Sequence, residues 1–231
     1  MKVMNQMIAV VSVIGLCAAL GCDQRPPVSP DAARPAAAAS SAADASSNAS
    51  ERAQPSVFAA ACDINAALTD FRTALGPLNP NVVGEQNGGR REVNWDAVPP
   101  ASTNTFTFPG DFFNQNFSPR ARGVVFSTDG SGLSVSDNDF AFINPAYDVE
   151  FNAFSPVRTF SAIGSASTRV DLFVAGTGTP ARSTGFGVVF SDVDHMGSAS
   201  IKLLGVNGNS LGVYHAPPCP GGFSFVGVQF P

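Results

Sequence analysis

The chain has 231 residues and a formal net charge of −5 at pH 7, with 13 Lys and Arg against 18 Asp and Glu. Beyond Lys2 it contains a single lysine, Lys202. Proteins that bind DNA or RNA need a stripe of basic side chains to neutralise phosphates. The composition therefore excludes a nucleic-acid-binding protein, and no nucleic acid is expected among its partners.

The N-terminus has the pattern of an export signal. Lys2 precedes the apolar run MIAVVSVIGLCAAL, which is too short to span a bilayer core of roughly 30 Å and suits a signal peptide. The next residues, Ala19 to Cys22 (ALGC), resemble the lipobox of bacterial lipoproteins, in which the cysteine is lipidated. The resemblance implies a signal peptide at 1–21, a lipid anchor on Cys22 and a place in the bacterial cell envelope. The alternative is an ordinary cleaved signal peptide and secretion.

A segment of low complexity follows at 22–55. It consists almost wholly of Ala, Ser and Pro, and its one large aliphatic residue is Val28. Such a segment buries too little apolar area to offset the entropy of ordering it, so it is predicted to be a disordered tether. The remaining residues, 56–231, are enough for one domain with a substantial core.

Two cysteines remain once the signal peptide and the lipidation site are set aside. They are Cys62 and Cys219, and in an oxidising compartment they are expected to form a disulfide. A zinc site is the rival interpretation, but two isolated cysteines without a neighbouring histidine lack the usual ligand spacing.

One helix is predicted, at about residues 58–75. A stripe of four apolar residues has helical spacing there: Ile64, Leu68, Phe71 and Leu75. Gly76 and then Pro77 form a good stop signal.

The rest of the domain is predicted to be β-rich, with short runs separated by turn residues. Strands are expected at 105–108, 123–128, 133–136, 140–143, 158–164, 169–175, 185–193, 200–206, 210–216 and 222–230. This rhythm favours an antiparallel, jelly-roll-like β-sandwich with one N-terminal helix. The 19 Phe residues would fill the layer between the two sheets.

Several motifs together resemble a family of uncharacterised exported bacterial β-sandwich proteins. They include GRREVNWDAVP, PRARGVVFST, FSPVRTFSAIGS, GFGVVFSDVD and NGNSLGVYHAP followed by GFSFVGVQF, and they span about residues 68–230. The resemblance implies the fold and the exported location, but no activity. Family members continue past FVGVQF with another Arg-containing strand, which implies that this chain ends one strand early.

Enzyme motifs are weak. GNSLG matches the G-x-S-x-G pattern around Ser210, but that motif works at a strand-to-helix turn, and here it lies in a predicted hairpin. His195 follows Asp192 and Asp194 with no nucleophile placed nearby in sequence. A carboxylate pair for glycoside hydrolysis could also draw on Asp96. We expect a protein that is not an enzyme.

Calcium is the candidate cofactor. Acidic residues occur in several predicted turns: Asp129, Asp137, Asp139, Asp192 and Asp194. Calcium requires six to eight oxygen ligands. The competing interpretation is that Asp and Asn make these turns through bonds to their own backbone.

The segment GRREVNWDAVP contains the only tryptophan of the chain. A glycan could stack on Trp95, with Arg91, Asp96 and Tyr147 as the other expected contacts. The competing interpretation is structural, with Arg90 or Arg91 paired to Glu92 or Asp96 and the ring capping the sandwich.

The expected function is non-catalytic binding of a glycan or another surface component by an exported, lipid-anchored protein. A structural or matrix-adhesion protein without a small-molecule site is the alternative, and a hydrolase ranks third.

Overall fold

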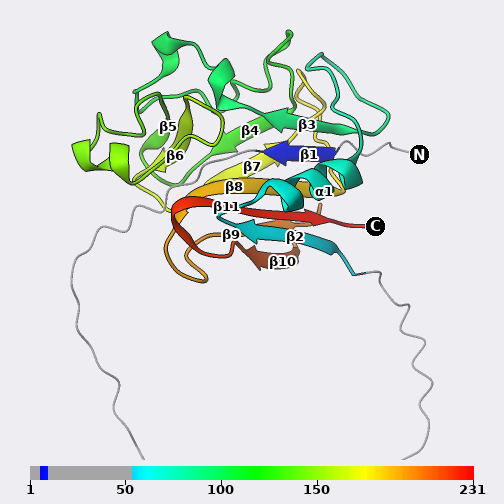
Figure 1. The fold of residues 1–231 in the computed structure, drawn as a ribbon. Coiled ribbons are helices and arrows are strands. Elements are labelled where there is room, and N and C mark those ends of the chain that lie inside the picture. Colours follow the sequence, from blue (N-terminus) through cyan, green and yellow to red (C-terminus); the bar gives the residue numbers. More distant parts are fainter. Residues whose placement is uncertain (1–5, 10–53) are drawn as a thin grey trace, which may run out of the picture.

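The computed structural model describes residues 6–9 and 54–231 (Figure 1). The lipidation candidate Cys22, most of the expected signal peptide (1–21) and the tether up to residue 53 lie outside the described residues. Within the described ranges, no helix is long and apolar enough to cross a membrane.

The described chain is mainly β, with antiparallel pairs and one α-helix, as the sequence predicts. The helix α1 spans Asn65–Leu75, and short 3-10 turns span Trp95–Ala97 (η1), Pro100–Ser102 (η2) and Pro145–Val149 (η3). The strands are β1 (Gln6–Ala9), β2 (Ser56–Ala61), β3 (Arg90–Val93), β4 (Val124–Ser127), β5 (Gly132–Ser136), β6 (Thr159–Ile163), β7 (Arg169–Leu172), β8 (Gly185–Val193), β9 (Ser200–Leu204), β10 (Ser210–His215) and β11 (Cys219–Gln229).

The central sheet is three-stranded and antiparallel, in the order β2-β11-β8. Three further antiparallel pairs are β4 with β7, β5 with β6, and β9 with β10. β1 and β3 form a parallel pair. Figure 1 shows α1 lying against the central sheet.

The predicted apolar stripe of the helix is confirmed, because all four of its residues are buried: Ile64, Leu68, Phe71 and Leu75. The ring of Phe71 sits over a paired glycine step, Gly187 of β8 opposite Gly227 of β11. A Cβ atom added at Gly187 would lie 2.6 Å from that ring. These glycines therefore let the helix approach the sheet closely.

The predicted start of the helix is wrong. Residues 58–61 belong to β2, which pairs with β11 from Ser56 to Ala61. Cys62 then takes a φ of 66°, a conformation that no helix interior contains. Alanine-rich sequence favours a helix locally, but pairing with the long strand β11 overrides that preference.

Two predicted strands are also wrong. Residues 105–108 share one backbone hydrogen bond with β5, from the Phe108 N–H to the Leu133 carbonyl oxygen, and form no continuing ladder. Residues 140–143 form a turn, since Asp139 and Phe140 both have positive φ. The alternating rings of that run pack into a small separate cluster instead of a sheet. The strands β1, β2 and β3 are not predicted from the sequence.

The disulfide between Cys62 and Cys219 is confirmed. It joins the residue that follows β2 to the first residue of β11, with a Cα–Cα distance of 5.5 Å. The bond therefore links the start of the domain to its last strand across a sequence separation of 157 residues.

Candidate functional site

Trp95 lies inside the main core. Its side chain is 3% exposed. The ring stacks on Phe160 with 4.1 Å between centroids and packs edge-on against Phe113 at 5.3 Å. Phe108 and Phe126 complete the surroundings. The indole therefore presents no open face on which a sugar could stack, and it fills the core of the domain.

The two arginines of the segment take different places. Arg90 donates to Glu92 at 2.7 Å, and Arg72 of α1 donates to the same carboxylate at 2.7 and 2.9 Å. Arg91 is 2% exposed and donates to the Gly84 carbonyl oxygen at 3.1 Å. Arg90 and Glu92 thus pair as the structural interpretation expects. The contribution of Arg72 was not foreseen, because only the fold brings α1 to β3.

Asp96 anchors a distant loop. It accepts hydrogen bonds from the Ser155 hydroxyl and from the Arg158 backbone N–H, while the Arg158 guanidinium donates to the Val98 carbonyl oxygen at 2.9 Å. Beneath the segment, Arg122 lies over the Phe113 ring at 4.5 Å. Burial lowers the pKa of Arg122 to about 10. These contacts favour the structural interpretation of GRREVNWDAVP.

Glu92 is expected to stabilise the fold in a pH-dependent way. Burial alone raises the pKa of Glu92, but the hydrogen bonds and charges of Arg72 and Arg90 outweigh it, so the pKa is lowered overall. A carboxylate with a lowered pKa stabilises the folded state above its unfolded pKa of about 4.3, and loses that effect as the pH falls through the folded value.

We expect Glu92→Gln to lower the free energy of unfolding at pH 7 by about 1–3 kcal/mol, since two part-buried cations lose their acceptor charge. Urea unfolding at pH 7 and at pH 3 measures the effect, and the difference from the unsubstituted protein should shrink at pH 3. Asp171→Asn is the control, because its ion pair with Arg169 is exposed and such pairs contribute little. Equal losses for both variants would contradict the prediction.

The acids predicted as calcium ligands are dispersed. Asp137 accepts from the Asn104 amide at 2.6 Å and from the Thr103 hydroxyl at 2.9 Å. Asp192 accepts from the Gly221 backbone N–H at 2.7 Å. Across residues 6–9 and 54–231, no three acidic, histidine or cysteine residues are grouped closely enough to hold a metal ion. Calcium binding by Asp129, Asp137, Asp139, Asp192 and Asp194 remains a prediction from sequence.

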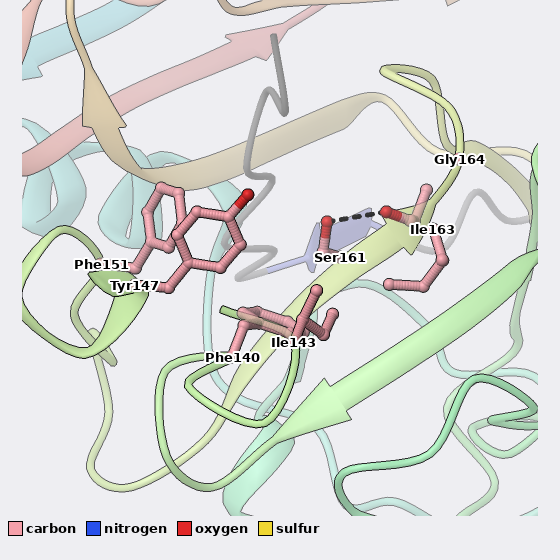
Figure 2. Close-up of a pocket in the computed structure, with 8 residues that line it drawn as sticks. Phe140, Ile143, Tyr147, Phe151, Ser161, Ile163 and Gly164 are labelled. Carbon is pink, nitrogen blue, oxygen red and sulfur yellow. Dashed lines mark hydrogen bonds between the residues drawn. The ribbon is translucent and has the colours of Figure 1, made fainter. Parts of the chain in front are cut away.

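One small hollow lies between the turn after β5 and the strand β6 (Figure 2). Its volume is about 50 Å³. It is lined by Phe140, Ile143, Tyr147, Phe151, Ser161, Ala162, Ile163 and Gly164. Figure 2 shows the rings of Tyr147 and Phe151 side by side at one wall, and their centroids are 5.2 Å apart.

Tyr147 is the one predicted ligand residue that lines this hollow. Arg91, Trp95 and Asp96 belong to the segment described above and do not line it. The other lining residues were not predicted as site residues. The signal for them is the run of rings in FAFINPAYDVEF, of which only residues 140–143 are predicted as a strand.

The hollow suits a small apolar group. The Ser161 hydroxyl already donates to the Ala162 carbonyl oxygen at 2.9 Å, so the interior offers mainly carbon atoms. Pockets that enclose a drug-sized ligand have volumes of roughly 300–1,000 Å³. A hollow of about 50 Å³ admits the tip of a side chain or a short alkyl group and leaves the rest of a ligand outside.

Two acidic residues are sequence neighbours of the lining residues, since Asp139 precedes Phe140 and Glu150 precedes Phe151. Burial raises the pKa of Asp139, and the charge of Asp148 adds to this shift. Burial raises the pKa of Glu150 as well, and the charges of Asp192 and Asp194 add to it.

Ser210, the serine of the weak G-x-S-x-G motif, does not line the hollow. Ser210 begins β10, which forms a hairpin with β9. Its Oγ accepts a hydrogen bond from the Gly212 N–H at 3.3 Å. The serine thus sits in a strand-to-strand connection and not at the strand-to-helix turn on which the G-x-S-x-G motif depends.

Comparisons with protein-family models, with curated proteins and with solved structures found no match to this chain.

Proposed function

We propose that this chain is an exported, lipid-anchored protein of the bacterial cell envelope that binds a surface component without catalysing a reaction. The N-terminal export pattern, the lipobox-like ALGC and the Ala/Ser/Pro segment support the location. The Cys62–Cys219 disulfide is typical of an oxidising compartment.

The observation that carries the binding proposal is the hollow beside Tyr147. Ile143, which lines the hollow, is 39% exposed, and Val149, two residues after Tyr147 in the sequence, is 83% exposed. These two residues and the half-buried Tyr147 belong to the loop that joins β5 to β6, and we propose that they form an apolar lip there. Binding residues often lie on loops that a rigid scaffold positions. An apolar group of a surface component fits this lip, and a glycan that stacks on Tyr147 is the second candidate ligand.

The fold that we infer for the whole domain is a jelly-roll-like β-sandwich. One cluster of buried residues joins strands of the central sheet to strands of the smaller pairs, with Val188 and Val226 on one side and Phe126, Val135 and Phe160 on the other. Shared burial of this kind is what two packed layers of strands produce. In such a scaffold the loops gather at the ends of the layers.

We expect Tyr147→Ala to weaken binding of the exported protein to envelope fragments of the producing bacterium by about tenfold, because an aromatic anchor at the centre of a contact can contribute 1.4 kcal/mol or more. Sedimentation of the labelled protein with the fragments measures it, and a glycan array tests the second ligand class. Tyr214→Ala is the matched control, since Tyr214 lies on β10, away from the hollow.

If Tyr147→Ala and Tyr214→Ala bound the envelope fragments equally well, the proposed binding site at Tyr147 would be contradicted. It would favour the alternative function, a structural or matrix-adhesion protein without a small-molecule site. The burial of Trp95 at 3% exposure and the closed Arg72–Glu92–Arg90 cluster are the observations that favour this alternative.

A further inference from the structure

β1 lies between β3 and β8, and the position that it fills is called the slot below. β1 pairs in parallel with β3, with Gln6 opposite Arg90 and Ala9 opposite Val93. β1 also runs close beside β8, and Figure 1 shows it between the two strands. The slot thus joins the central sheet to the segment that contains Trp95.

On the side of β3 that faces β1, the backbone N–H and C=O groups are available for pairing with a neighbouring strand. Arg90 uses its other side, where its N–H donates to the Pro77 carbonyl oxygen and its carbonyl oxygen accepts from the Asn79 N–H, both at 2.8 Å. Backbone groups of successive residues in a strand point to opposite sides. Arg91 and Val93 therefore direct theirs toward β1.

β8 borders β1 on one edge but does not pair with it in a ladder. β8 bonds to β11 along its length, from Gly185 to Val193, and its opposite edge borders β1. An edge whose N–H and C=O groups have no partner is a template for another extended segment. Without β1, two such edges would face each other across the slot.

The surroundings of the slot define what it can accept. On one face, Val93, Val188 and Phe190 belong to the main core. On the other face, Val189 of β8 packs in the cluster under α1. A segment that pairs with β3 beside these apolar residues is expected to be extended, uncharged and mainly apolar. The sequence of β1, QMIA, satisfies these conditions.

The native leader cannot remain in the slot if it is removed on export. Residues 6–9 lie inside the expected signal peptide (1–21), and cleavage before Cys22 would take them away. We propose that the slot between β3 and β8 is a strand-acceptor site in the exported protein, and that it binds an extended, uncharged, apolar segment of a partner polypeptide parallel to β3. This rests on the proposed leader removal but not on the Tyr147 hollow.

The test uses the purified exported protein and a labelled peptide with the sequence of residues 4–11, MNQMIAVV. We expect saturable binding by fluorescence anisotropy, and at least about tenfold weaker binding of the same peptide with proline in place of the isoleucine, which lacks the N–H that a ladder requires. Hydrogen exchange should slow in β3 and β8 on binding and stay unchanged in the β9–β10 hairpin.

The controls separate this proposal from its rivals. The same chain made with its leader retained should not respond to the peptide, because β1 already fills its slot. Equal binding of the proline peptide, protection confined to other strands, or an exported protein whose intact mass still includes residues 1–21 would overturn the proposal. The proposal would also be overturned if the exported protein formed a dimer that did not bind the peptide and in which β3 and β8 were protected from hydrogen exchange. In that case a second copy of the chain would fill the slot.

Discussion

Replacing Trp95 with alanine is expected to lower the free energy of unfolding by about 3–5 kcal/mol, which is the usual cost of removing a buried large aromatic side chain. The expected loss is large because the ring stacks on Phe160 and contacts Phe113 and Phe126 in the main core. A domain of this size has a total stability of about 5–15 kcal/mol, so the variant should be close to unfolded at 37 °C. Urea unfolding followed by far-UV circular dichroism measures the change.

Trp95→Phe is the informative companion, since it keeps an apolar ring and should lose distinctly less stability than the alanine variant. Tyr147→Ala, at the half-buried wall of the hollow, should cost less than Trp95→Ala. A loss below about 1 kcal/mol for Trp95→Ala would show that the indole is not part of a packed core. That result would restore the glycan-stacking interpretation of GRREVNWDAVP.

Removing the disulfide is expected to cost about 2–5 kcal/mol. The sequence separation of 157 residues between Cys62 and Cys219 closes a long loop, and the loop-entropy account assigns the largest effects to long loops. We expect a matching drop in the urea midpoint when the protein is reduced, or when both cysteines are replaced by serine. The double variant should show no further response to reductant.

A reductant effect that persists in the double variant would contradict this assignment. No change on reduction of the unsubstituted protein would mean that the β2–β11 pairing, from Ser56–Gln229 to Ala61–Ser224, holds the two ends together without help from the bond.

Much of the fold was predictable because local patterns and tertiary structure agree. The strand at 185–193 is found with the same limits as β8, since its apolar run is buried on both faces. The four-residue stripe of α1 is buried as expected, because its spacing matches the helix period. The predicted start of the helix is wrong, because residues 58–61 form an alanine-rich run whose conformation is decided by pairing with β11.

The candidate site was less predictable, because it depends on which loops the fold brings together. Tyr147 was singled out as an aromatic with a polar end, but its neighbours Phe151 and Ser161 come from different elements. Periodicity assigned Phe140 to a strand, whereas its φ of 66° places it in a turn. No sequence pattern encodes such a convergence of separate segments.

The sequence by itself determined the β-rich class, the apolar stripe of the helix and the pairing of the two cysteines, since each depends on composition or on short-range periodicity. The tertiary structure alone decided the role of Trp95. Its ring is enclosed by Phe108, Phe113, Phe126 and Phe160, which come from separate parts of the chain. Burial is a property of these distant neighbours together, so an aromatic residue among charged ones looks the same in sequence whether it binds a ligand or fills a core.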